Sequence, residues 1–296
     1  MRLKPVLVVS GILLTLFVTF VVLVIAAGSM PSRSTRLLSA NKVGVVVVVG
    51  AIMDSQDVIE ELVDFQNDHS VKAIVLRVDS PGGGVGPSQE IYEAVRDIRK
   101  IKPVVASMGS VAASGGYYIA AACEKIYANP GTMTGSIGVI MEFADLRELL
   151  GKIGVGTRVI KSGRLKDIGS PTRDMTPEEK MLLQGVIDDA YDQFVEAVAA
   201  GRHLDKDKVK AVADGRIMTG RQAQALQLVD ELGGLSAAVR GAADIAGMSG
   251  DPQVVYPEEE KPSLMDLLMK NMMTSFQQSL QQRVTSGLQF RWVMDQ

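Results

Sequence analysis

An uncharged apolar stretch near the amino terminus limits what this chain can fold into more than any other feature. From Val6 to Ala27 there is no charged residue, and only a few small or hydroxyl residues interrupt the large apolar side chains. A helix of this length would be about 33 Å long, enough to cross the core of a bilayer. A cleaved signal peptide usually has a shorter apolar core of roughly 7 to 15 residues, although Ala26-Ala27-Gly28 resembles a weak cleavage site. We therefore predict an uncleaved transmembrane anchor in residues 1–28.

The charges that flank this stretch do not determine its orientation. Arg2, Lys4 and the terminal amine lie on one side, and Arg33, Arg36 and Lys42 lie on the other, so the positive-inside rule gives no preference. Residues 29–41 contain proline and several polar residues, a composition typical of a juxtamembrane linker.

The composition excludes several classes of function. The 296 residues suffice for one catalytic domain with appendages. The net charge of −3, with no long basic run, argues against a nucleic-acid partner. Cys123 is the one cysteine of the sequence, which excludes an intrachain disulfide and a cysteine-based zinc cluster. We expect no metal and no cofactor.

Beyond the linker, apolar runs and helical patterns alternate along the chain. Apolar runs typical of strands lie at 45–49 and 73–78, and further strand candidates lie at 104–107, 125–128, 137–141 and 157–161. Helical patterns lie at 58–65, from Pro87 to Ile98 and at 114–123. Unbroken apolar runs are typical of strands that helices cover on both faces. The alternation predicts an α/β domain with crossover connections over residues 42–256.

Two segments have the form of helix caps. Thr176-Pro177-Glu178-Glu179 is a capping box with proline at the first helical position, so we predict that a long helix begins there. Thr219 and Gln222 form a second capping pair, and Gly233-Gly234 predicts a break in the helical region that follows.

The carboxyl-terminal residues form a separate segment. An acidic piece with two prolines, Pro257 to Pro262, precedes an apolar stripe at helical spacing that runs from Leu264 to Phe276. We predict a linker and an amphipathic helix in residues 257–296. This helix either folds back onto the core or takes part in self-association.

The glycine-rich segment Asp79-Ser80-Pro81-Gly82-Gly83-Gly84 directly follows a predicted buried strand and precedes a helix. Its backbone N–H groups are not shielded by side chains, so an oxyanion could approach them closely. The segment lacks the spacing of nucleotide-binding loops, so phosphate binding fits poorly. A plain turn between strand and helix remains the alternative.

A serine among small residues opens the next helix. Ser114 lies in Ala112-Ala113-Ser114-Gly115-Gly116, where a hydroxyl can be exposed and the helix dipole favours developing negative charge. We identify Ser114 as a candidate nucleophile, with an ordinary helix cap as the alternative. Ser110 is a second candidate nucleophile, and an ordinary helix cap is again the alternative.

A nucleophilic serine needs a base, and histidine is scarce. The two histidines, His69 and His203, both lie in polar connections without a motif, so a Ser/His/Asp triad is not expected. Lys161 and Lys166 lie in a loop-like segment after a predicted strand, and their spacing does not separate them. Either would need a pKa reduced from near 10.4 to about 7 or 8 to act as a base at neutral pH.

Four segments together resemble the signal peptide peptidase A family of serine proteases, in its short form with one copy of each motif. They are Asp-Ser-Pro-Gly-Gly-Gly (79–84), Ala-Ala-Ser-Gly-Gly-Tyr-Tyr (112–118), Ala-Asn-Pro-Gly-Thr-Met-Thr-Gly-Ser-Ile-Gly-Val (128–139) and Lys-Ser-Gly with Lys-Asp (161–167). The resemblance covers about residues 43–235. It implies a ClpP/crotonase-like layered fold of repeated β-β-α units.

The resemblance also implies a role for each site residue. Ser114 would be the nucleophile and Lys166 the base, while Ser136 would orient the lysine amine. The backbone N–H groups of Gly82 or Gly83 and of Gly115 would form the oxyanion hole.

The family's short members form rings in which the lysine can reach the serine of a neighbouring subunit. By resemblance, this chain would be a single-pass protein of the cytoplasmic membrane with its catalytic domain outside the cytoplasm. Its substrates would be residual signal peptides and other unstructured apolar peptides.

Two other functions compete with peptide hydrolysis through an acyl-enzyme. One is a catalytically inactive, membrane-tethered scaffold of the same fold. The other is CoA-thioester chemistry, which the predicted anchor and the Ser/Lys pairing disfavour.

Overall fold

The computed structural model describes residue 19 and residues 41–257 of the chain. The predicted anchor, linker and carboxyl-terminal helix lie outside these residues, apart from Thr19, Asn41 and Pro257. Within the described part of the chain, no helix is both long and apolar enough to cross a membrane. Contacts divide the chain after Val255, and the fold described below is that of residues 41–255.

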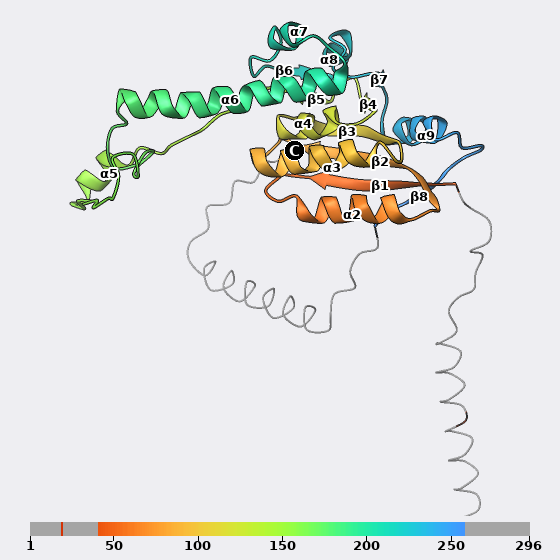
Figure 1. Cartoon of the computed structure of the whole chain (residues 1–296), viewed down its shortest axis with the longest axis horizontal. Helices are drawn as coiled ribbons and strands as arrows, with labels where there is room; N and C mark the ends of the chain where they lie inside the picture. Colours follow the sequence, from red (N-terminus) through yellow and green to blue (C-terminus); the bar gives the residue numbers. More distant parts are fainter. Residues whose placement is uncertain (1–18, 20–40, 258–296) are drawn as a thin grey trace, which may run out of the picture. The chain divides into compact units, whose positions relative to one another are not determined.

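A largely parallel sheet forms the centre of the fold (Figure 1). Its strands follow the order β6-β5-β3-β2-β1-β8, and β4 joins β3 to β7. The three long central strands are β1 (Lys42–Val49), β2 (Val71–Ser80) and β3 (Val104–Ala113). The short strands are β4 (Lys125–Ala128), β5 (Met133–Gly135), β6 (Ile217–Thr219), β7 (Glu231–Leu232) and β8 (Gln253–Val255). Only the β5–β6 pairing is antiparallel among these strands.

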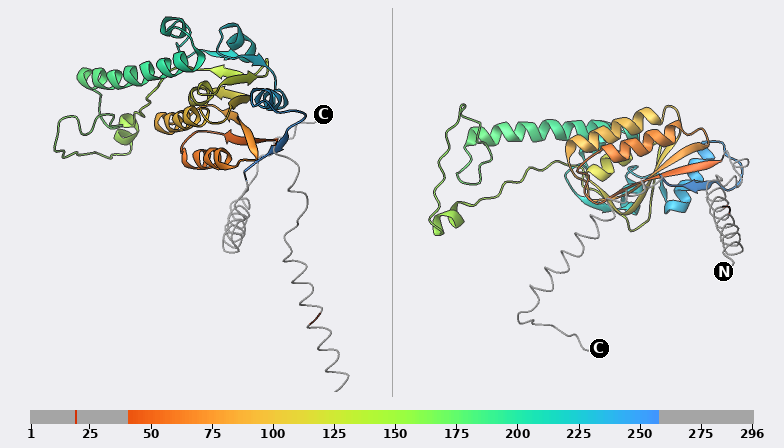
Figure 2. Two further views of the ribbon diagram at one scale, coloured as in Figure 1. Left: turned by 45° about the vertical axis from the view of Figure 1, so that its right-hand side comes forward. Right: turned by 90° about the horizontal axis from the view of Figure 1, so that it is seen from below.

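Helices cover both faces of the sheet, as the unbroken apolar runs predict (Figure 2). Alternate residues of β1 and β2 point to opposite faces, so Val46 and Leu76 belong to one apolar cluster and Val45 and Val75 to the other. The larger cluster packs against α2 (Gln56–Asn67), α3 (Val85–Ile98), α4 (Gly115–Ala121) and α6 (Pro177–Arg202). The smaller cluster packs against α9 (Leu235–Ile245). The α/β fold with a parallel sheet is therefore confirmed.

Short extended pieces follow the long strands before the next helix begins. Ile52 pairs with Gly83 in an isolated bridge, and the last three residues of β3 pair with β5. This order of strand, short strand and helix fits the expected β-β-α unit. It also brings the glycine-rich segment after β2 next to the end of β3, where Ser80 pairs with Ala112.

Both predicted capping boxes are confirmed. The Thr176 hydroxyl accepts a hydrogen bond from the Glu179 amide, and the Glu179 carboxylate accepts one from the Thr176 amide. Thr219 and Gln222 make the same reciprocal pair at the start of α8 (Gly220–Ala225). The remaining helices are α5 (Arg147–Lys152) and α7 (Lys206–Lys210).

The strands predicted at 137–141 and 157–161 are wrong. Neither segment is in a strand, and the nearby strand β5 lies earlier, at Met133–Gly135. Ile140 and Ile160 are almost fully exposed, at 89% and 102%. An apolar β-branched run becomes a strand only where a neighbouring strand accepts its hydrogen bonds, and none lies beside these two runs in the described residues.

The second half of α6 packs against α4 without space for an additional atom. Its buried side chains include Phe194, Val195 and Val198. A Cβ atom added to Gly201 would lie 1.9 Å from the carbonyl oxygen of Ala121 in α4. Gly185, earlier in the same helix, has open space around it.

We expect opposite effects from alanine at these two glycines. Gly201→Ala should lower the free energy of unfolding by about 1–3 kcal/mol through overpacking. Gly185→Ala should raise it by up to about 1 kcal/mol, because alanine is the better helix former. Urea unfolding of both variants measures this, and a Gly201→Ala protein as stable as wild type would contradict the described packing.

Candidate active site

The site lies at the carboxyl ends of β2 and β3, where parallel strands direct their following loops to one edge of the sheet. Ser114 forms the sharp turn between β3 and α4, with φ 53° and ψ −122°. A strained turn of this kind between a strand and a helix exposes a nucleophilic side chain. The turn is held from both sides: the Ser114 amide donates to the Gly135 carbonyl at 2.9 Å, and the Ser114 carbonyl accepts from the Tyr118 amide at 2.9 Å.

Gly82 makes the closest approach to this turn and has a φ of 102°. A Cβ atom at Gly82 would lie 2.8 Å from the Cβ of Ser114 and 2.7 Å from the amide nitrogen of Gly115. Both the backbone angle and the available space therefore require glycine here. The glycine-rich segment and the serine turn are thus adjacent, as the sequence motifs alone could not show.

The amides of Gly82 and Gly83 differ in their hydrogen bonds. The Gly82 amide donates to the Ser80 hydroxyl at 3.1 Å, and the Gly84 amide donates to the Ile52 carbonyl at 2.8 Å. The Gly83 amide has no acceptor among residues 41–257. The amide nitrogen of Gly83 also lies 3.2 Å from the point where a Cβ of Gly115 would be. Gly83 and Gly115 are therefore the pair of amides that could bind one oxyanion.

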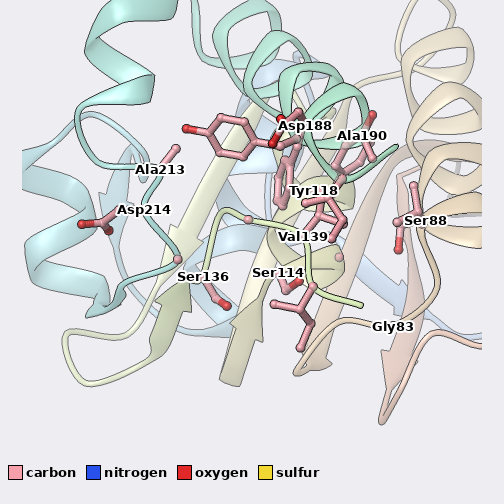
Figure 3. Close-up of a pocket in the computed structure, with 18 of the residues that line it drawn as sticks. Gly83, Ser88, Ser114, Tyr118, Ser136, Val139, Asp188, Ala190, Ala213 and Asp214 are labelled. Carbon is pink, nitrogen blue, oxygen red and sulfur yellow. The ribbon is translucent and has the colours of Figure 1, made fainter. Parts of the chain in front are cut away.

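Ser136 lies on the other side of Ser114 from Gly83 (Figure 3). It follows β5 directly, has a φ of 50°, and donates its amide to the Arg216 carbonyl at 2.8 Å. Ser114 and Ser136 are both half-buried and line one pocket of about 570 Å³.

The wall of this pocket is largely apolar. Tyr118 and Phe194 pack with ring centroids 4.8 Å apart, and burial raises the pKa of Tyr118, so its phenol stays neutral. Other lining residues are the apolar or aromatic Val85, Val139, Ile140, Ile187, Ala190 and Tyr191 and the polar Ser88, Asp188 and Asp214. The pocket can therefore hold an apolar side chain beside the Ser114 hydroxyl.

Neither of the two lysines considered as a base lines this pocket within one chain. Lys161 donates to the Asp167 carboxylate and to the Arg164 carbonyl. The Lys166 side chain is exposed and has no hydrogen-bond or ion-pair partner among the described residues. Both lysines thus lie outside the pocket of their own chain, and they differ in that Lys161 has hydrogen-bond partners among the described residues.

The loop that carries Lys166 is fastened to the start of α6. Arg173 donates to the Asp167 carboxylate at 2.9 Å and to the Glu179 carboxylate at 2.5 Å. Asp167 directly follows Lys166, and the Glu179 side chain is 3% exposed. The Arg173 guanidinium and the Thr176 amide hold the pKa of Glu179 down at about 2. Arg173 thus fastens the loop that carries Lys166 to the capped amino terminus of α6.

The other polar candidates lie away from the pocket. His69, His203 and Ser110 are exposed and do not line it. Sequence reasoning missed two contributors, the Ser80 hydroxyl and the Ile52 backbone. Ser80 lies inside the recognised motif, but a serine at a strand end gives no sign of what its hydroxyl binds. Ile52 lies outside every motif and acts only through its main chain.

The chain is similar to proteins of one peptidase family. The profile of peptidase family S49 matches residues 96–249, and the Clp protease profile matches residues 31–134. A protein of Synechocystis sp. named "Putative protease slr0021" is 48% identical over 223 residues, which are 75% of this chain and 80% of that protein.

Two further relatives are longer than this chain. The "Putative signal peptide peptidase SppA" of Enterococcus faecium is 44% identical over 179 residues, covering 60% of this chain and 52% of its own. The "Serine protease SPPA, chloroplastic" of Arabidopsis thaliana is 36% identical over 222 residues, covering 74% of this chain and 33% of its own. The chain therefore spans about half of the first of these two relatives and a third of the second.

The Arg173 bridge should make stability depend on pH. Because the folded pKa of Glu179 lies below its ordinary value of 4.5, its contribution is complete above about pH 4.5 and is lost as the pH falls toward 2. We expect Arg173→Gln to be less stable than wild type at pH 7, with a difference that shrinks as the pH is lowered through this range. Urea unfolding of both proteins across pH 3 to 7 measures it.

Arg164→Gln is the matched control. Arg164 pairs with Glu178 one residue away, but both side chains are more than half exposed. Arg164→Gln should therefore lose little stability, because an exposed ion pair contributes little. An equal loss of stability in the two variants would contradict a stabilising role for the Arg173–Glu179 ion pair. A loss of stability in Arg173→Gln that does not change with pH would also contradict it.

Proposed function

Because this chain belongs to peptidase family S49, we propose that it is a serine peptidase with Ser114 as nucleophile and Lys166 as general base. The observation that carries the proposal is the strained Ser114 turn beside the Gly83 and Gly115 amides, at the end of an apolar pocket. Such a site has a nucleophile, two oxyanion donors and a place for an apolar side chain of the substrate. Ser136, on the far side of Ser114, is the proposed hydrogen-bond partner that orients the lysine amine.

The reaction proceeds in two halves. The Ser114 hydroxyl oxygen attacks the scissile carbonyl carbon while its proton passes to the neutral Lys166 amine, and the oxyanion accepts hydrogen bonds from Gly83 and Gly115. The C–N bond then breaks, and the Lys166 ammonium gives the proton to the leaving amine. In the second half a water molecule gives a proton to Lys166 and attacks the acyl ester. The carboxylic acid leaves as the proton returns to the Ser114 oxygen.

We propose that Lys166 of one chain serves Ser114 of a neighbouring chain in a homo-oligomeric ring. Two observations support this arrangement. Lys166 does not line the pocket of its own chain, and the segment that precedes it exposes an apolar surface. The exposed residues are Ile140, Leu149, Ile153, Val159 and Ile160, with Met181 and Val186 in the first half of α6, and they are 51% to 102% exposed. Apolar surface on this scale is typical of a protein–protein contact.

The proposed substrates are signal peptide remnants and other unfolded apolar segments. The apolar wall around Tyr118 and Phe194 suits apolar side chains, and a relative bears the name of a signal peptide peptidase. The uncharged stretch from Val6 to Ala27 would tether the enzyme to the bilayer in which such peptides remain. We therefore propose a single-pass protein of the cytoplasmic membrane whose catalytic domain lies outside the cytoplasm.

Single substitutions test the two catalytic roles. Ser114→Ala and Lys166→Ala should each lower kcat for a fluorogenic apolar peptide by about 10³-fold or more, because one removes the nucleophile and the other the base. The full-length protein in detergent micelles is the sample. Thermal unfolding of each variant should match wild type.

Ser110→Ala and Lys161→Ala are the matched controls, since they remove the rival serine and the rival lysine. Both should keep turnover within several-fold of wild type. Full activity in Ser114→Ala or Lys166→Ala would reject the assignment, and inactivity of the wild-type oligomer would favour a scaffold of the same fold.

A further inference from the structure

Ser80 is a buried polar residue that the proposed reaction does not use directly. It is the last residue of β2 and is fully buried. Its hydroxyl accepts a hydrogen bond from the Gly82 amide, two residues further on, at 3.1 Å. A serine that bonds the backbone two residues ahead forms a local turn in place of a continued strand. This turn begins the loop that approaches Ser114.

The loop formed by residues 80–84 makes two further backbone hydrogen bonds, both to Ile52. The Gly82 carbonyl accepts from the Ile52 amide at 3.0 Å, and the Gly84 amide donates to the Ile52 carbonyl at 2.8 Å. These two bonds fasten the loop to the segment after β1. Together with the Ser80 bond they occupy the amides on both sides of Gly83 and leave the Gly83 amide free to bind an oxyanion.

The Ser80 bond is the one that fixes the first peptide of this loop. Glycine has no Cβ to restrict its backbone, so the peptides around Gly82 and Gly83 could rotate at little cost. Without the hydroxyl, the buried Gly82 amide would lack an acceptor, which is unfavourable for a buried N–H group. A rotation that relieved this cost would turn the neighbouring Gly83 amide away from its present direction.

Ser80 also contacts the part of the site that carries the nucleophile. It pairs with Ala112, two residues before Ser114. Its carbonyl oxygen lies 2.7 Å from the point where a Cβ of Gly116 would be. One residue therefore borders both the loop that holds Gly83 and the turn that holds Ser114, so it sets their separation.

We propose that Ser80 is a positioning residue: its hydroxyl holds the Gly82 peptide so that the Gly83 amide points at the developing oxyanion. This inference rests on the proposed function and deepens it. Oxyanion stabilisation acts on the transition state and not on the bound peptide. The role of Ser80 is therefore distinguishable from a purely structural one by kinetics.

Ser80→Ala in the full-length protein tests the role. We expect kcat for the apolar peptide to fall about 10- to 100-fold, with KM within about threefold of wild type, because a misdirected oxyanion donor weakens transition-state binding alone. The affinity of a peptide boronic acid, which forms a tetrahedral adduct with a nucleophilic serine, should fall by a similar factor. Ser107→Ala is the control, since Ser107 is also fully buried and its hydroxyl accepts from Arg77 at 3.0 Å. The Ser107→Ala variant should keep the wild-type kcat even if its free energy of unfolding falls.

A second pair of variants removes any dependence on how well Ser80→Ala folds. Ser80→Thr and Ser80→Val have the same shape, and only threonine keeps the hydroxyl. The threonine variant should have the higher kcat, and equal kcat values in the two would overturn the role of Ser80. Unchanged kcat and boronate affinity in folded Ser80→Ala would overturn it as well, while wild-type turnover dependent on Ser114 would leave the proposed function intact. Wild-type protein without such turnover would reject the function and this role together.

Discussion

The close approach of Gly82 to Ser114 is the contact on which the rest of the site depends. It is possible because Gly82 has no side chain and adopts a φ of 102°, and because Ser114 accepts a strained turn at the end of β3. The parallel pairing of β2 with β3 brings these two turns to the same edge of the sheet. That juxtaposition also brings the Gly83 amide close to Gly115.

Local patterns predicted the elements that depend on local interactions. The runs at 45–49 and 73–78 are β1 and β2, and the two capping boxes begin α6 and α8, because burial on both faces and cap bonds leave a direct signature in sequence. The candidates at 137–141 and 157–161 also contain β-branched residues but have no neighbouring strand in the described chain. Strand pairing is a property of the partner as well as of the run, so composition alone could not exclude them.

The residues of the site also divide into those that local sequence predicts and those that depend on distant contacts. The motifs identified Ser114, Ser136 and the glycines, but they could not choose between Gly82 and Gly83 or between Lys161 and Lys166. The structure adds the hydrogen bonds on which the proposed choice rests: the Gly82 amide donates to the Ser80 hydroxyl, and the Lys161 ammonium donates to the Asp167 carboxylate. Lys166 remains on a loop fastened to α6 by Arg173, outside the pocket of its own chain. The proposed contact of its amine with Ser114 of a neighbouring chain is not encoded in any local pattern.

Complementation between inactive chains tests most directly whether one site is built from two copies. Ser114→Ala protein supplies intact lysine loops, and Lys166→Ala protein supplies intact serine pockets. When the two are co-assembled and the mixed oligomers are verified by mass spectrometry, a shared site predicts that peptidase activity returns, although each variant alone is inactive. Verified mixed oligomers that remain inactive would contradict the assignment of Lys166 to the Ser114 of a neighbouring chain.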